Sequence, residues 1–123
     1  MDIEKLLQEA VTKPSDEVLA SAPFLDGWWI IQAGHFLRAR GQVDGHPSID
    51  DPYVTTSPIM GFNATEGWMR TRSRYYRLGT PIDLEKLRLV RAIPIPVADH
   101  ILEQMRSGLW KEITDEKGKG RLH

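Results

Sequence analysis

The chain contains no cysteine and no long hydrophobic run. Without cysteine it can form no disulfide bond, no thiolate metal site and no cysteine nucleophile. No segment approaches the ~20 apolar residues that a membrane-spanning helix needs, and residues 1–5 lack the basic start and apolar stretch of a signal peptide. We therefore expect a cytoplasmic protein that is stabilised by packing and does not enter a membrane.

An excess of charge of either sign is also missing. The chain has 16 Lys+Arg against 17 Asp+Glu, so its net charge of −1 gives no overall attraction to nucleic acid or membrane. The distribution is uneven, because residues 1–26 hold six acids and two lysines whereas residues 27–80 hold six arginines and four acids. This asymmetry fits either an oriented approach to a charged partner or an internal match between a helix and a sheet.

The 123 residues suffice for one domain, which we place at residues 1–114, followed by a flexible polar tail at 115–123. Apolar residues with helical spacing predict a helix over residues 3–11, and Ser15 can cap a second short helix after Pro14. A further helix is predicted over residues 97–107, with Gly108 just past its end.

Strand patterns fill the middle of the chain. An apolar run at 28–31 precedes three longer runs at 36–43, 53–62 and 68–78, joined by turn-forming residues. Residues 82–93 fit a helix or a strand, and we favour the strand. The predicted fold is α+β: a small twisted antiparallel sheet of three to five strands, open or curled into a barrel, packed with the N-terminal helices and a C-terminal helix.

We expect the core to be formed by the apolar helix faces together with Trp28, Trp29, Ile30, Leu37, Val43, Val54 and Met60. The sequence leaves open whether Trp28 and Trp29 lie in the core or at an interface, and it does not determine the oligomeric state.

The densest pattern is a set of arginines at alternate positions in two predicted strands. Because successive side chains of a strand point to opposite faces, Arg38 and Arg40 share a face of the first strand, and the even-numbered positions share a face of the second. If the two strands pair, these residues form one cationic and aromatic sheet face. The candidate binding residues are Arg38, Arg40, Trp68, Arg70, Arg72, Arg74 and Tyr76.

Such a face suits two classes of partner. Arginine binds carboxylates and phosphates through its planar fork, and aromatic rings stack on bases. We predict a non-enzymatic binding module whose partner is an acidic protein surface, with single-stranded nucleic acid as the alternative. A third interpretation needs no partner: the arginines pair with the acids of residues 2–26 or face water.

No motif specifies a reaction or a cofactor. The glycines belong to separate turns, so they form no phosphate-binding loop, and we expect neither a cofactor nor a metal. His46 lies near Asp50, Asp51 and Thr55 in the sequence, and a small hydrolase built on these residues is the second alternative. Turns carry the same residue types for solvation, so a protein without enzymatic activity is favoured.

Three motifs cover about a third of the chain: Gly41-x-Val43-x-Gly45-His46-Pro47, Thr55-Thr56-Ser57-Pro58 and Gly67-Trp68-x-Arg70-Thr71-x-Ser73-Arg74-x-Tyr76-x-Leu78-Gly79. In these motifs the chain resembles a family of small uncharacterised bacterial proteins, a domain of unknown function that is mainly alphaproteobacterial and plasmid- or phage-associated. The resemblance implies a shared compact β-unit and a mobile-element context, and it carries over no catalytic residue. It suggests an accessory or inhibitor protein that acts by occluding a host or phage complex.

Overall fold

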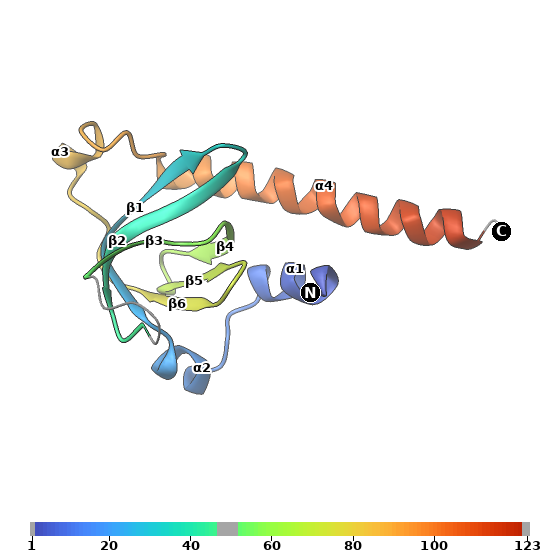
Figure 1. Cartoon of the computed structure of the whole chain (residues 1–123), viewed down its shortest axis with the longest axis horizontal. Coiled ribbons are helices and arrows are strands. Elements are labelled where there is room, and N and C mark those ends of the chain that lie inside the picture. Colours follow the sequence, from blue (N-terminus) through green and yellow to red (C-terminus); the bar gives the residue numbers. More distant parts are fainter. Residues whose placement is uncertain (1, 47–51, 122–123) are drawn as a thin grey trace.

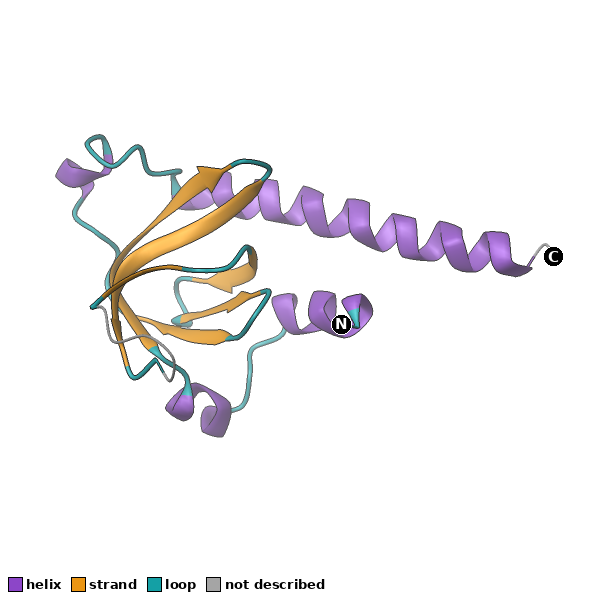
Figure 2. Cartoon of the chain, in the orientation of Figure 1, coloured by secondary structure: helices purple, strands orange, loops and turns teal. Residues whose placement is uncertain are grey.

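The computed structural model describes residues 2–46 and 52–121 of the chain. It confirms the α+β class, with a six-stranded, mostly antiparallel sheet, two N-terminal helices and a C-terminal helix (Figures 1 and 2). The elements follow in the order α1 (Ile3–Val11), α2 (Asp16–Ser21), β1 (Phe24–Ala33), β2 (Phe36–Asp44), β3 (Tyr53–Thr55), β4 (Ile59–Asn63), β5 (Trp68–Thr71), β6 (Tyr75–Leu78), α3 (Leu84–Leu87) and α4 (Ile95–Arg121).

Both predicted N-terminal helices are confirmed, and side chains cap each of them. Asp2 accepts a hydrogen bond from the backbone N–H of Lys5 at 3.2 Å, and Ser15 accepts one from Val18 at 3.3 Å. These bonds satisfy backbone donors that the first turn of a helix leaves unpaired.

The sheet contains six strands rather than three to five, because two of the predicted strands are each divided. The run at 53–62 is interrupted at Pro58, which has no N–H to donate to a ladder, and the run at 68–78 is interrupted at residues 72–74. The spatial order is β3-β2-β1-β6-β5-β4, with β1 and β6 parallel and the other neighbours antiparallel.

A short connection joins the two edges of this sheet. β3 and β4 are the edge strands, and only residues 56–58 lie between them. A chain of this length reaches at most about 14 Å from Thr55 to Ile59, so the sheet must curl until its edges come close. The described strands β3 and β4 do not pair with each other, and the sheet therefore stays open.

Hydrogen bonds hold this 56–58 link to strands on both sides. The backbone N–H of Thr56 donates to the Ala39 carbonyl at 2.8 Å, and the buried Thr56 Oγ1 accepts from the Ala39 N–H at 3.0 Å. On the other side, the Arg72 N–H donates to the Pro58 carbonyl at 2.8 Å. The link thus connects β2 to the turn between β5 and β6.

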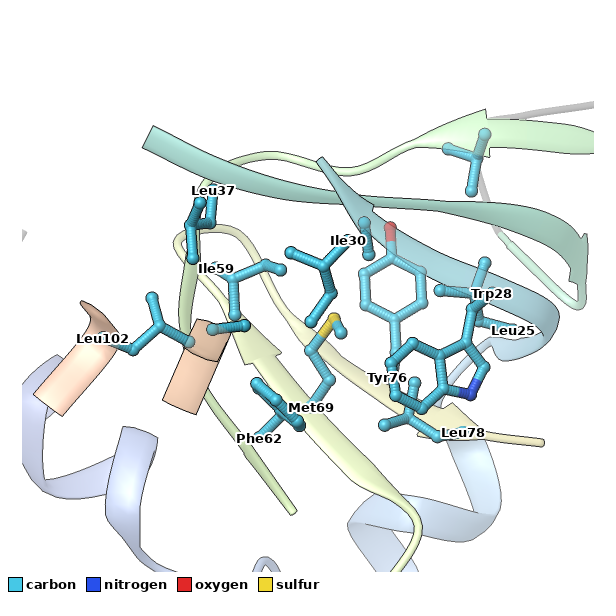
Figure 3. Packing of buried hydrophobic residues seen from close by; sticks show 13 residues of the cluster. Leu25, Trp28, Ile30, Leu37, Ile59, Phe62, Met69, Tyr76, Leu78 and Leu102 are labelled. Carbon is cyan, nitrogen blue, oxygen red and sulfur yellow. The ribbon is translucent and has the colours of Figure 1, made fainter. Parts of the chain in front are cut away.

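The main core lies inside the curled sheet (Figure 3). Trp28 is 1% exposed, and its indole N–H donates to the Gly79 carbonyl at 3.0 Å. Of the predicted core residues, Trp28, Ile30, Leu37 and Val54 lie in this cluster, with Val43 at its margin. Met60 belongs to a second cluster with α1, while Trp29 is only half-buried. Trp28 is therefore core, and Trp29 is not fully so.

The favoured strand at 82–93 is wrong. A short helix, α3, occupies residues 84–87, and Arg91 has a left-handed φ of 53°, which breaks an extended chain. In the second half of this segment, Ile93 forms an isolated bridge to Ile30 of β1.

The predicted end of the C-terminal helix at Gly108 is also wrong. α4 passes through Gly108 and continues to Arg121, into the segment predicted to be a tail. Ala98 and Leu102 enter the main core, and Met105, Leu109 and Ile113 pack beside α1. This apolar stripe continues past the glycine, so tertiary packing compensates for the low helix propensity of that residue.

Two glycine substitutions should have opposite effects on stability. Gly108→Ala should raise the free energy of unfolding by about 1 kcal/mol, because Gly108 lies inside α4 with no atom within 4 Å of the added methyl group. Gly61→Ala should lower it by about 3 kcal/mol, because its Cβ would collide with the Ala10 carbonyl of α1. Urea unfolding measures both, and destabilisation by Gly108→Ala would contradict a continuous α4.

Candidate functional site

The turn between β5 and β6 determines where the predicted site residues point. Thr71, which is fully buried, accepts hydrogen bonds from the N–H groups of Ser73 and Arg74 at 3.3 and 3.2 Å. Its hydroxyl also donates to the Arg74 carbonyl at 3.1 Å. These bonds turn the chain at residues 72–74 and interrupt the strand alternation that was expected to run from Trp68 to Leu78.

The interruption shifts which residues share a face. In the β5–β6 pair, Arg70 lies opposite Tyr75 and Met69 lies opposite Tyr76. Opposed residues of an antiparallel pair share a face, so Tyr75 rather than Tyr76 accompanies Arg70. Tyr76 points into the core and is 3% exposed (Figure 3). The expected placement of Tyr76 on the arginine face is wrong.

Trp68 also fails to form part of an exposed surface. It is 3% exposed, and its ring packs edge-on against Tyr75 with centroids 6.3 Å apart. The strand that carries Arg38 does not pair with β5 or β6 either, since β1 lies between them. The seven predicted binding residues therefore do not form one continuous sheet face.

Arg70 is neutralised inside the molecule. Its Nε donates to Glu9 Oε2 of α1 at 3.0 Å, its Nη1 donates to the Thr71 carbonyl at 2.8 Å, and its guanidinium lies 5.1 Å from the Tyr75 ring centre. The Tyr75 hydroxyl donates to the Glu9 carbonyl at 3.3 Å. For Arg70, the interpretation in which the N-terminal acids pair with the sheet is confirmed.

Arg74 is half-buried and faces α2. With Arg70 and Tyr75 it lines a hollow of about 300 Å³ whose other wall includes Val18 and Pro23. It therefore lies apart from the arginines of β2.

Three of the predicted arginines do converge, on residues 55–58. Arg38 Nη1 donates to the Thr56 carbonyl at 3.0 Å, and Arg40 Nε donates to Thr55 Oγ1 at 3.1 Å. Arg72 belongs to the turn between β5 and β6, and its backbone N–H donates to the Pro58 carbonyl. Its guanidinium lies 5.6 Å from the Phe36 ring centre. We call Arg38, Arg40 and Arg72 the link arginines.

The link arginines make no ion pair with an acid in the described part of the chain. Arg40 and Arg72 are exposed and Arg38 is half-buried. Among the residues that the structure describes, the ion pairs within 4.0 Å are Lys13–Glu66 and Arg70–Glu9, so no described carboxylate reaches a link arginine. Within the described residues, the side-chain hydrogen bonds of Arg38 and Arg40 go to neutral oxygens, and each uses one of the five N–H donors of a guanidinium group.

The sequence pattern allowed Phe36 beside the arginines of β2, but it gave no role at this site to Ser57 and Ser73. Phe36 is 38% exposed beneath Arg72, and Ser57 Oγ accepts from the Ser73 N–H at 3.3 Å. The motif at residues 55–58 was the available signal, but its role in joining two sheet edges cannot be read from local spacing.

Of the residues in the hydrolase alternative, the structure describes His46 and Thr55, whereas Asp50 and Asp51 lie outside the described residues. His46 lies with its ring centre 6.2 Å from that of Tyr76, and burial together with the Arg74 charge lowers its pKa from 6.5. Thr55 Oγ1 accepts the Arg40 hydrogen bond. Over residues 2–46 and 52–121, no three His, Asp or Glu side chains are grouped so that they could hold a metal.

No helix in the described ranges is long and apolar enough to cross a membrane. In comparisons with known proteins, residues 2–95 match the model of a family of unknown function (DUF6634). No curated protein and no solved structure matches the chain.

The Arg70–Glu9 pair should contribute measurably to stability. Its side chains are 15% and 28% exposed, so a double-mutant cycle with Arg70→Ala and Glu9→Ala should give a coupling energy of about 1 kcal/mol in urea unfolding. Lys13–Glu66 is the matched control, since it is 3.8 Å long and its side chains are 48% and 43% exposed. Equal coupling in the two cycles would contradict the structural role of Glu9.

His46 should titrate below its ordinary pKa of 6.5, first because of burial and second because of Arg74. Because the folded-state pKa lies below that of the unfolded chain, the associated stability is present above pH 6.5 and is lost as pH falls through the folded-state pKa. NMR titration should show the His46 pKa rising towards 6.5 in Arg74→Gln. It should be unchanged in Arg88→Gln, and an equal rise in both variants would contradict a specific Arg74 effect.

Proposed function

We propose that this chain, which belongs to the DUF6634 family of unknown function, is a non-enzymatic binding module that recognises an acidic surface of another protein through its link arginines. One observation carries the proposal: Arg38, Arg40 and Arg72 each bond to residues 55–58, with no carboxylate within 4.0 Å in the described part of the chain. Their guanidinium groups are held in place yet keep free donors, which suits bidentate binding of carboxylates.

The surroundings of these arginines favour a protein partner over single-stranded nucleic acid. Nonspecific binding of single strands combines positive charge with exposed rings on which bases stack. Trp68 and Tyr76 are each 3% exposed, and Arg72 lies over the ring of Phe36. The arginines therefore supply the positive charge that binding of a single strand needs, whereas most of the aromatic rings on which bases would stack are buried.

The cellular setting is part of the same proposal. We infer a cytoplasmic accessory or inhibitor factor linked to a plasmid or phage, on the resemblance of the three motifs to mobile-element proteins. Such a factor acts by covering an acidic surface of a larger complex, for which charge and shape suffice without chemistry.

A charge-matched pair of variants tests the proposal. The variant Arg38→Gln/Arg40→Gln/Arg72→Gln should bind a fluorescein-labelled glutamate-rich peptide about tenfold more weakly than the unmodified chain, since each exposed charge contributes about 0.5 kcal/mol. The control Lys5→Gln/Lys86→Gln/Arg88→Gln removes three exposed charges elsewhere and should bind like the unmodified chain. Fluorescence anisotropy at low salt measures all three.

Equal weakening in both triple variants would show attraction by overall charge alone and would overturn the proposal. The same proteins should be tested for retardation of single-stranded DNA and RNA in native gels. Retardation stronger than binding of the acidic peptide, and lost in the link-arginine variant, would replace the protein partner with a nucleic acid.

A further inference from the structure

A cavity lies beside β1, and Trp29 in its wall lies opposite Arg40 of β2 in the strand register. Past Pro81, the chain that leads from β6 to α4 donates two backbone hydrogen bonds to β1: the Ile82 N–H donates to the Trp28 carbonyl at 2.9 Å, and the Ile93 N–H donates to the Ile30 carbonyl at 2.7 Å. The two anchor points are two residues apart on β1, so the residues between them form a loop that stands away from the sheet and carries α3 (Figure 1).

The space enclosed by this loop and β1 has a volume of about 790 Å³. This lies within the range of about 300–1,000 Å³ that is typical of small-molecule sites. Its walls are mostly apolar and include Trp28, Trp29 and Ile30 from β1 and Ile82, Leu87 and Ile93 from the loop. Trp29, which did not take its predicted place in the core, is half-buried here.

The only charged residues that line the cavity within the described chain are two acids, Asp83 and Glu85, both exposed. Lys86, the nearest base along the chain, lines a neighbouring hollow together with Asp83, and it makes no ion pair within 4.0 Å with either acid in the described structure. The cavity therefore combines an aromatic and aliphatic interior with a negative margin. Indole rings add to the attraction for cations through their electron-rich faces.

We propose that this cavity binds a small organic cation, with an apolar body against Trp29 and Leu87 and a positive group beside Asp83 and Glu85. The shape supplies apolar contact, and the charge selects the sign of the ligand. This ligand differs in charge from the proposed acidic partner, because the link arginines attract negative groups.

Three probes with the same alkyl chain test this site: hexyltrimethylammonium, hexanol and hexanesulfonate. In ¹⁵N–¹H NMR spectra of the full chain, hexyltrimethylammonium should shift the amide signals of residues 28–30, 82–93 and 95 and the indole signal of Trp29, and the shifts should saturate. Hexanol should bind about fivefold more weakly, and hexanesulfonate should leave these signals unchanged.

The variant Asp83→Asn/Glu85→Gln should bind hexyltrimethylammonium about fivefold more weakly and should bind hexanol with unchanged affinity. Asp83 makes no capping hydrogen bond to α3, so this variant keeps the local fold, which its own amide spectrum verifies. Glu112→Gln/Asp115→Asn on α4 is the charge-matched control and should bind like the unmodified chain. Equal affinity for hexyltrimethylammonium and hexanol, or no shift at these residues with the cation, would overturn the proposal.

Discussion

The three-residue link between the two edge strands is the constraint on which the rest of the structure depends. β3 and β4 lie at opposite ends of the strand order, yet only residues 56–58 connect them. An open sheet can satisfy this only by curling, and the curl encloses the core in which Trp28, Met69 and Tyr76 meet (Figure 3). The buried hydroxyl of Thr56 holds the link by accepting from Ala39 and donating to the Ser57 carbonyl.

The same link explains why arginines of similar local sequence differ so much in environment. Arg38 and Arg40 lie on the outer face of β2, and the link brings the β5–β6 turn, with Arg72, to the same place. Arg70 lies only two residues before Arg72, but it precedes the turn and faces α1, where Glu9 neutralises it. A change of backbone direction at Thr71 thus separates an internal ion pair from an exposed charge.

The two proposed sites carry charged groups of opposite sign, although Trp29 of the cavity lies opposite Arg40 of β2. The link arginines present positive charge on a mostly polar surface, whereas the β1 cavity presents Asp83 and Glu85 around an apolar interior. Net charge close to zero conceals this separation, because the opposite signs cancel in the sum but act on ligands locally. The polar surface suits a macromolecule, and the concave apolar space suits a small ligand.

Local signals in the sequence determined the α+β class, both N-terminal helices with their caps at Asp2 and Ser15, and the hairpin strands β1 and β2, because periodicity and capping act between residues close in the chain. The extent of α4 beyond Gly108, the division of the 68–78 run and the burial of Trp68 and Tyr76 were decided by tertiary structure. Each depends on a contact between distant segments. The end of α4 packs beside α1, and the Arg72 N–H in the turn after Thr71 donates to the Pro58 carbonyl of the 56–58 link. The aromatic rings are buried because the sheet curls around them. Alternation predicts which face a side chain shares only while the strand is unbroken, and the break here is stabilised by a buried hydroxyl and by a link from the opposite edge of the sheet.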